Sequence, residues 1–189
     1  MFKEVFSTEL GLEHEVSRPL VIRKRLRPVF PFVMISVLLV LPLRTTASAG
    51  QDYIVLTGGS AEILSARKVP VFGAEYRFKE NLRGIQPYVL YGWATDGGTY
   101  AGAGLLYYFT RSPRWRVTVS SCPGYYRRHR IARDLGHTLE FFSNRELSTR
   151  IYRGHWLGLS FGHVSNGGID RDNNPGSETW RLAYASPLR

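Results

Sequence analysis

The sequence is poor in cysteine, in helical periodicity and in long apolar runs. Its single cysteine, Cys122, can form no disulfide within the chain and supports no cysteine-based metal site. After residue 50, no segment of useful length repeats its apolar residues at the period of a helix. These absences exclude disulfide-stapled and helical classes of protein, and they leave an all-β fold as the prediction.

The longest apolar run lies near the start of the chain and is interrupted by prolines. It spans residues 29–43, follows a basic cluster at 23–27 and precedes Ala47-Ser48-Ala49. It is short for a membrane-spanning helix, and its order of basic, apolar and small residues is that of a secretory signal peptide. We therefore expect residues 1–49 to be removed, with residues 50–189 left as one mature domain.

The predicted mature domain stays basic, with 18 Lys and Arg against 11 Asp and Glu. No segment interleaves basic and aromatic residues in the manner of a nucleic-acid module. An anionic lipid surface is therefore the favoured partner, and we expect no nucleic acid.

Eight short stretches rich in Tyr, Phe, Val, Leu and Thr follow, separated by Gly, Pro, Asp, Asn and Arg. Their expected bounds are 52–64, 69–79, 86–95, 99–110, 114–125, 137–151, 155–165 and 177–187. Stretches of this length can cross a bilayer as tilted strands, and an even number of them suits an outer-membrane barrel. The sequence thus predicts an eight-stranded antiparallel transmembrane β-barrel, in which Pro187 stops pairing close to Ala185.

Alternation within these stretches supports strands. In the second one, Phe72 and Tyr76 share a face opposite Glu75. A water-soluble barrel would alternate in the same way with its apolar face inward. The aromatic content, the signal peptide, and Gly102 and Gly104 at expected inner positions favour the membrane version.

A polar group interrupts the apolar face at the end of the seventh stretch. His163 and Ser165 share a face with Phe161 and the leucines before it, a face that should meet lipid. Glu178 lies on the corresponding face of the eighth stretch, with Trp180. The connection between the two stretches brings the end of one beside the start of the other, so we expect the three polar side chains to converge.

These residue types are the ones that ester cleavage requires. Ser165 supplies a hydroxyl nucleophile, His163 a base, and Glu178 a carboxylate that holds the imidazole tautomer. Asn166 offers amide donors to the oxyanion, helped by backbone N–H groups of the following glycines, with Gly167 first. Polar groups on a lipid-facing wall are costly unless they have a use, but near the headgroups they are tolerated. Catalysis and a non-catalytic barrel therefore both stay open on the pattern alone.

Other candidates are weaker. Residues 158–162 match the nucleophile-elbow pattern, which requires a strand-to-helix turn that a continuous strand does not provide. His155 lies at the other end of its strand and reads as a polar anchor. The spacing of His129 and His137 to Asp134 indicates no metal site.

The C-terminal third resembles the PagL family of outer-membrane lipid A 3-O-deacylases. The residues that carry the resemblance are Asp134–Phe141, Leu159–Gly168, Asn174-Pro175-Gly176 and Glu178. Their order and spacing are fairly specific, and the earlier strands match only in general character.

This resemblance implies that residues 50–189 form an outer-membrane β-barrel esterase whose site lies on the outer wall, facing the outer leaflet. It implies hydrolysis of the ester-linked 3-hydroxyacyl chain at position 3 of lipid A, with Ser165 as nucleophile, His163 as general base, Glu178 as orienting acid and Asn166 as oxyanion donor. Lipopolysaccharide and outer-membrane lipids are the implied partners, with no metal and no cofactor. A non-catalytic outer-membrane barrel and a periplasmic barrel that binds lipid inside remain alternatives, and a homodimer is left open.

Overall fold

The computed structural model describes residues 50–79 and 84–188, so the predicted signal peptide lies outside the described residues. Eight antiparallel strands close into a barrel in which each strand pairs with its sequence neighbours and the last pairs with the first. The fold class predicted from the sequence is confirmed. The strands are β1 (Tyr53–Ala61), β2 (Val69–Arg77), β3 (Ile85–Ala94), β4 (Thr99–Arg111), β5 (Trp115–Arg127), β6 (Leu139–Tyr152), β7 (His155–Ser165) and β8 (Ser177–Pro187).

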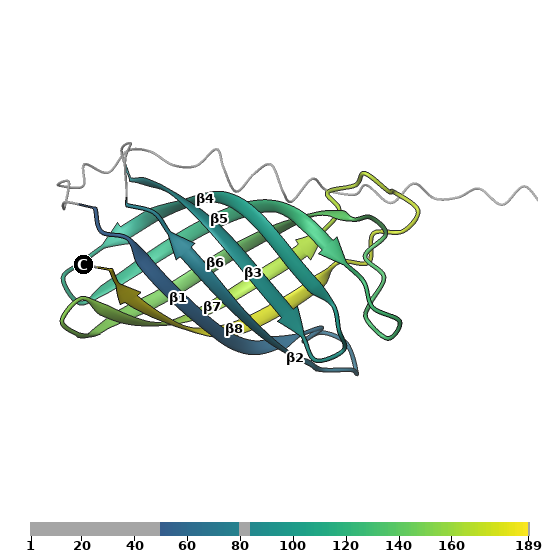
Figure 1. The fold of residues 1–189 in the computed structure, drawn as a ribbon, viewed down its shortest axis with the longest axis horizontal. Coiled ribbons are helices and arrows are strands. Elements are labelled where there is room, and N and C mark those ends of the chain that lie inside the picture. Colours follow the sequence, from purple (N-terminus) through teal and green to yellow (C-terminus); the bar gives the residue numbers. More distant parts are fainter. Residues whose placement is uncertain (1–49, 80–83, 189) are drawn as a thin grey trace, which may run out of the picture.

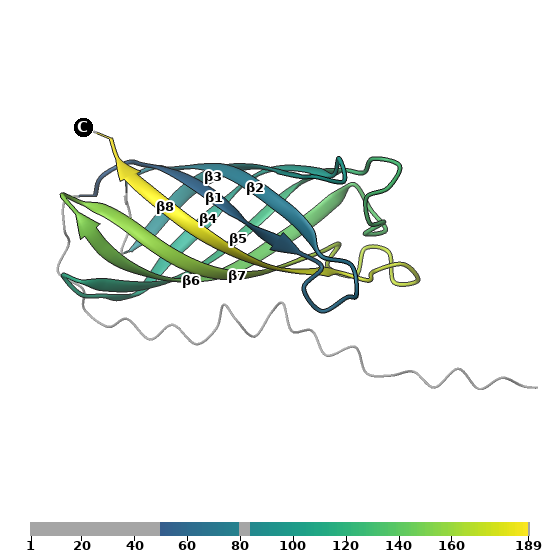
Figure 2. The same cartoon turned by 90° about the horizontal axis from the view of Figure 1, so that it is seen from below.

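The two ends of the barrel differ. The start of β1 and the end of β8 lie together at one end, here called the terminal end, and the strands run obliquely between the two ends (Figures 1 and 2). Two very short turns, 112–114 and 153–154, also lie at the terminal end. The connections at the opposite end, the loop end, span residues 62–68, 95–98, 128–138 and 166–176. The seventh strand therefore ends, and the eighth begins, at the loop end.

The interior of the barrel is polar over much of its length. Arg77, which is 1% exposed, places Nη2 2.8 Å from Glu75 and 2.7 Å from Glu146. Arg116 on β5 donates to Ser148, its direct partner on the neighbouring strand β6, at 3.1 Å. Apolar side chains pack together in part of the remaining interior, and the free Cys122 is buried among them, as a small strand residue should be. Buried ion pairs thus stabilise part of the barrel interior, where a soluble protein would have an apolar core.

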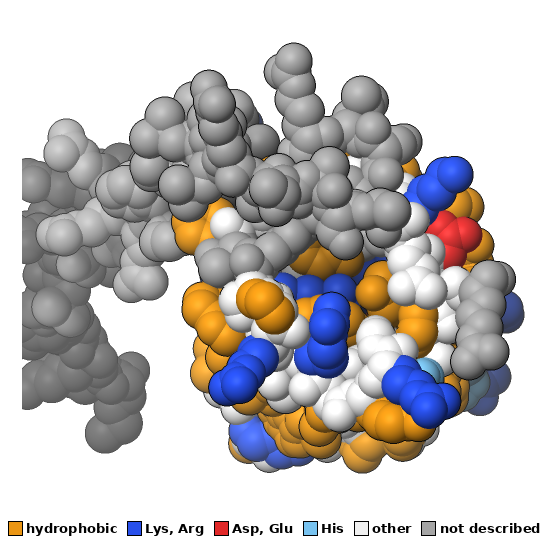
Figure 3. All heavy atoms as spheres, turned by 90° about the vertical axis from the view of Figure 1, so that its left-hand side faces the viewer, with side chains coloured by type: hydrophobic (Ala, Val, Ile, Leu, Met, Phe, Trp, Pro, Cys, Tyr) orange, Lys and Arg blue, Asp and Glu red, His pale blue; other side chains and the backbone are white. Residues whose placement is uncertain are grey.

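The outer wall is apolar. Leu157, Leu159 and Phe161 are 42–56% exposed and face away from the lumen. Seen from the terminal end, hydrophobic side chains cover much of the part of the wall that the view shows, while Lys and Arg side chains lie at the rim and in the mouth (Figure 3). The alternative of a periplasmic barrel that binds lipid inside required these three side chains to point inward, so the observed orientation contradicts it.

The final strand has its predicted bounds, but its pairing extends past the expected stopping point. Pairing does not stop near Ala185, because Ser186 pairs with Ile54 and Pro187 with Tyr53 in the closing seam. A proline is tolerated there because it occupies the last position of the strand, where a missing N–H removes little of the ladder. Closure of the barrel leaves no exposed sheet edge.

Candidate functional site

The structure brings two of the three predicted site residues into contact. His163 on β7 is the direct cross-strand partner of Glu178 on β8. The imidazole Nδ1 lies 3.4 Å from Oε1 of the carboxylate, and the two side chains are 44% and 38% exposed. Because Nδ1 faces the acid, Nε2 is the ring nitrogen left to exchange a proton with another group.

Ser165 lies two residues further along β7, on the same outer face as His163, and is the cross-strand partner of Phe141. It is only 6% exposed. In the described part of the chain its hydroxyl makes no hydrogen bond, so no such bond yet joins it to the imidazole. Catalytic hydrogen bonds are often long in a ligand-free enzyme and tighten when substrate binds.

A glycine makes room for the imidazole. Gly176, the last residue before β8, has φ +60°, and a Cβ built on it would lie 2.6 Å from Cε1 and 3.2 Å from Nε2 of His163. Any side chain here would therefore displace the ring. The left-handed backbone conformation of Gly176 independently disfavours larger residues. The Asn-Pro-Gly segment therefore leaves space beside the His163 imidazole.

Asn166 is committed to the loop that follows Ser165. Its side chain is fully buried, and Nδ2 donates to the carbonyl oxygens of Leu135 (3.1 Å), Asp170 (3.3 Å) and Asn173 (2.9 Å). Its Oδ1 accepts a hydrogen bond from the Gly168 N–H at 2.9 Å. An amide has only two hydrogens to donate, so this side chain could serve an oxyanion only by giving up a bond within the loop.

Gly167 is better placed to donate. It has φ +65° and lies against the ring of Phe141, beside Ser165. Across residues 50–79 and 84–188, no group accepts a hydrogen bond from its backbone N–H. The N–H that the sequence suggested as a helper is thus uncommitted, whereas the amide of Asn166 is occupied.

Two loops are in contact at the loop end of the barrel, next to Ser165. The bond from Asn166 to Leu135 joins the 166–176 loop to the 128–138 loop. An ion pair joins Arg128 to Asp134 within the latter loop. The end of β7, where Ser165 lies, is therefore held in place by a contact between two loops that are far apart in the sequence.

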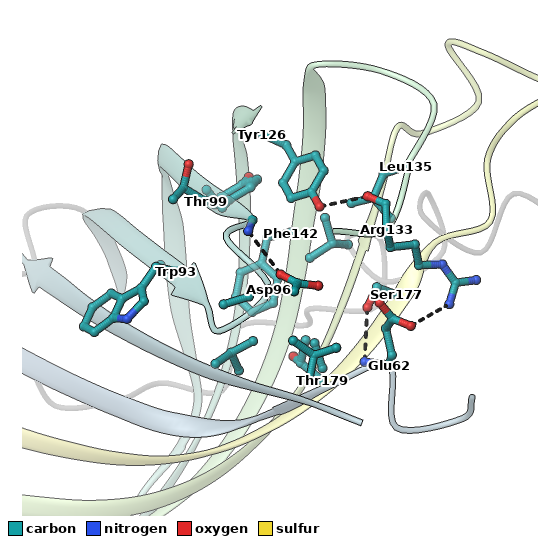
Figure 4. Close-up of a pocket in the computed structure, with 18 of the residues that line it drawn as sticks. Glu62, Trp93, Asp96, Thr99, Tyr126, Arg133, Leu135, Phe142, Ser177 and Thr179 are labelled. Carbon is teal, nitrogen blue, oxygen red and sulfur yellow. Dashed lines mark hydrogen bonds and ion pairs between the residues drawn. The ribbon is translucent and has the colours of Figure 1, made fainter. Parts of the chain in front are cut away.

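An interior cavity of about 120 Å³ lies below the loops (Figure 4). At its mouth, the Tyr126 hydroxyl donates to the carbonyl oxygen of Arg133 at 2.9 Å, and the Glu62 N–H donates to Ser177 Oγ at 3.3 Å. His163, Ser165 and Glu178 do not line this cavity, because their side chains face the other side of the barrel wall. The candidate site is thus on the outer wall and not in the lumen.

Sequence reasoning missed the contribution of β6. Ser143 is the direct cross-strand partner of His163, and Arg145 is the partner of Phe161, one position deeper in the wall. Period-two alternation from Leu139 onward places both on the outer face. The alternation in the sequence therefore indicated which face these residues occupy, but only the register between β6 and β7 shows that they lie beside His163 and Phe161.

The weaker candidates lie elsewhere. Ser160 is 1% exposed inside the barrel, where its hydroxyl donates to the carbonyl oxygen of Arg181 at 3.4 Å. His155 lies at the terminal end, where its Nδ1 is 2.8 Å from the Tyr184 hydroxyl. No group of three or more His, Cys, Asp or Glu suited to a metal occurs among the described residues. Within the same residues, no helix has the length and apolar character needed to span a membrane.

A closed barrel with a polar interior, an apolar wall and no exposed edge defines the class of outer-membrane β-barrel proteins. The family described as "Lipid A 3-O-deacylase (PagL)" matches residues 71–187. The chain belongs to the PagL family and is an outer-membrane β-barrel.

Solved structures share the fold at low sequence identity. The crystal structure of the outer membrane enzyme PagL is 15% identical, with a TM-score of 0.56 over 72% of this chain and 99% of that one. Neisserial surface protein A is 12% identical, with a TM-score of 0.58 over 75% and 100%. A designed transmembrane β-barrel is also 12% identical, with a TM-score of 0.57 over 76% and 100%. No curated protein sequence matches the chain.

Proposed function

We propose that the chain is a lipid A 3-O-deacylase that hydrolyses the ester-linked 3-hydroxyacyl chain at position 3 of lipid A. One observation carries the proposal. In a member of the PagL family, the outer wall holds an imidazole–carboxylate pair, His163 and Glu178, at 3.4 Å, beside the hydroxyl-bearing Ser165. Nucleophile, base and orienting acid are the set that acyl transfer requires.

In the proposed reaction, His163 Nε2 takes the proton of Ser165 Oγ as this oxygen attacks the ester carbonyl. Glu178 holds Nδ1–H and stabilises the imidazolium that forms. The developing oxyanion accepts a hydrogen bond from the Gly167 N–H. The imidazolium then protonates the departing sugar oxygen, and water cleaves the acyl-enzyme to release the 3-hydroxy fatty acid and free Ser165.

The place of the site in the membrane supports this substrate. In barrels of this class the short turns face the periplasm and the longer loops face outside, so the loop end with Ser165 would meet the outer leaflet. Phe161 and Trp180, 56% and 37% exposed, lie one position deeper on the same wall, where the acyl chains run. Lipopolysaccharide and outer-membrane lipids are the proposed partners, and the mechanism uses no metal or cofactor.

The test compares two serines that flank the same imidazole. Lipid A is extracted from cells that make the wild-type protein, Ser165→Ala or Ser143→Ala, and its acyl chains are counted by mass spectrometry. We expect the 3-linked chain to be lost with wild type and with Ser143→Ala, and to be retained with Ser165→Ala in a barrel that still inserts. Deacylation by Ser165→Ala at the wild-type rate would overturn the assignment of the nucleophile. A wild-type protein that releases no fatty acid from purified lipopolysaccharide would favour a non-catalytic barrel.

A further inference from the structure

An apolar groove of about 570 Å³ lies on the outer wall, in the half of the barrel near the terminal end. His163, Ser165 and Glu178 do not line it. Its side chains come from four neighbouring strands and include Trp115 of β5, Leu147 and Thr149 of β6, Leu157 and Leu159 of β7, and Leu182 of β8.

The groove and the candidate site lie at different depths in the membrane. Leu157 precedes Ser165 by eight residues on β7, which is about 26 Å along a strand. At the tilt of about 40° that is typical of these barrels, the separation across the membrane is about 20 Å. Because the apolar band of such a barrel is about 25 Å tall, Leu157 lies well past its middle. A lipid held in the groove therefore belongs to the leaflet at the terminal end.

An exposed arginine stands where the groove opens toward the terminal end. Arg114 directly precedes Trp115, which lines the groove. The carbonyl oxygen of Arg114 accepts hydrogen bonds from the Arg150 N–H at 2.8 Å and from Thr149 Oγ1 at 3.1 Å. These bonds hold the 112–114 turn against β6, so the position of Arg114 beside the groove is fixed.

A second exposed arginine lies in the turn between β6 and β7. Arg153 has φ +37° and is followed by Gly154 with φ +88°, and a two-residue turn with two positive φ angles favours Asn, Asp or Gly at its first position. Strained residues of this kind cluster at functional sites. The guanidinium carbon of Arg153 lies 5.1 Å from the centre of the exposed Tyr152 ring, a residue type enriched at membrane interfaces.

The two hairpins that carry these arginines are free of acidic residues. Residues 107–119 and 147–159 contain no Asp or Glu. The end of the groove is therefore cationic, and no carboxylate of these hairpins competes with an anion for Arg114 or Arg153. A guanidinium is suited to such an anion, because its planar fork matches phosphate oxygens with two parallel hydrogen bonds.

We propose that the groove and its two arginines form a binding site for an anionic phospholipid of the leaflet at the terminal end. The phosphate lies at Arg114 and Arg153, and an acyl chain occupies the groove. A zwitterionic headgroup binds less well, because its own cation is repelled by the two guanidinium groups. The site lies in the other leaflet from the candidate esterase site, and it does not depend on the proposed deacylase function.

Native mass spectrometry of the folded barrel in detergent tests the headgroup contacts. The protein is offered equal concentrations of phosphatidylglycerol and phosphatidylcholine with the same acyl chains, and the bound lipids are counted. We expect wild type to retain at least about tenfold more phosphatidylglycerol. Arg114→Gln/Arg153→Asn, in which Asn suits the turn, should lower phosphatidylglycerol binding by about 10- to 100-fold and leave phosphatidylcholine binding unchanged, because two charged contacts are lost.

Arg150→Gln is the matched control for the lost charge. Its guanidinium carbon lies 5.2 Å from the centre of the buried Trp156 ring, so this variant should bind both lipids as wild type does. Equal retention of the two lipids by wild type, or full phosphatidylglycerol binding by the double variant, would overturn the headgroup assignment.

A second pair of variants tests the groove. Leu147→Trp places a larger side chain in it and should lower the binding of both lipids at least about fivefold. Leu105→Trp changes a wall leucine that does not line the groove and is equally exposed, 57% against 58%, and should bind as wild type does. Equal binding by the two tryptophan variants would show that the groove holds no lipid. Heat-modified mobility in detergent gels confirms that each variant is folded before its lipids are counted.

Discussion

Replacement of Asn166 by alanine distinguishes a residue that holds the loop from one that contacts the oxyanion. The sequence placed an amide next to Ser165 and suggested a donor to the reacting ester. The structure shows that amide occupied by the carbonyl oxygens of Leu135, Asp170 and Asn173. We predict that the main effect of the substitution is to loosen the 166–176 loop.

The magnitude follows from the bonds that are lost. The amide can satisfy two of those carbonyl groups at a time, and its oxygen accepts one further bond from the Gly168 N–H. Three buried hydrogen bonds at about 0.5–1.5 kcal/mol each amount to about 1.5–4.5 kcal/mol. Because about 1.4 kcal/mol changes an equilibrium tenfold, the open population of the loop should rise by about tenfold to somewhat more than 1000-fold.

Limited proteolysis with trypsin measures this population. Arg171 is exposed within the loop and supplies a cleavage site. Cleavage there tracks the open population as long as the loop recloses faster than trypsin cuts. Cleavage after Lys68, in the loop between β1 and β2, is the internal control and should not change between wild type and Asn166→Ala. Acyl release should fall in the same variant, because Ser165 borders the loosened segment.

One result would refute this reasoning. If Asn166→Ala abolishes acyl release while Arg171 is cut at the wild-type rate, the loop has not loosened. The side chain would then act on the oxyanion itself, as the sequence first suggested, and the Gly167 N–H would not be sufficient.

Two further predictions concern the base and the barrel interior. Gly176→Ala should lower kcat at least about tenfold, because its Cβ would lie 2.6 Å from Cε1 of His163. The control is Gly168→Ala, which has φ +87° but no atom within 4 Å of its Cβ, and its kcat should fall much less. Equal losses of kcat in the two variants would contradict a steric role for Gly176. Arg77→Met should reduce the free energy of unfolding by about 3–5 kcal/mol, because it removes the closest cation from the buried Glu146 and leaves Glu75 only its longer ion pair with Arg181, at 3.7 Å. Urea titration of the refolded barrel measures the change, and an unaltered midpoint would refute the role of the ion pairs.

The fold could be predicted because its signal is local. Period-two alternation fixes which side chains face lipid, and turn residues mark where each strand stops. β7 and β8 have the predicted bounds, His155–Ser165 and Ser177–Pro187. The sixth strand begins at Leu139 and not at His137, because His137 accepts a hydrogen bond from the Leu139 N–H and ends the preceding loop. Short-range side-chain bonds of this kind are hard to read from alternation.

The site could be predicted only in part. A hairpin between neighbouring strands brings His163 beside Glu178, and that contact needs no knowledge of the rest of the barrel. The commitment of Asn166 to Leu135 depends on two loops meeting across 31 positions of sequence. The place of Ser143 opposite His163 depends on the register between β6 and β7. Both are tertiary facts that no local pattern specifies.

The proposed mechanism requires that the hydroxyl of Ser165, activated by His163, is the nucleophile on the outer wall. A lipophilic fluorophosphonate, which reacts covalently with activated serines, tests it most directly when the labelled peptide is located by mass spectrometry. We predict one adduct, on Ser165, in the wild-type protein and none in His163→Ala. An adduct on Ser143, or an active enzyme that takes no label at Ser165, would contradict it.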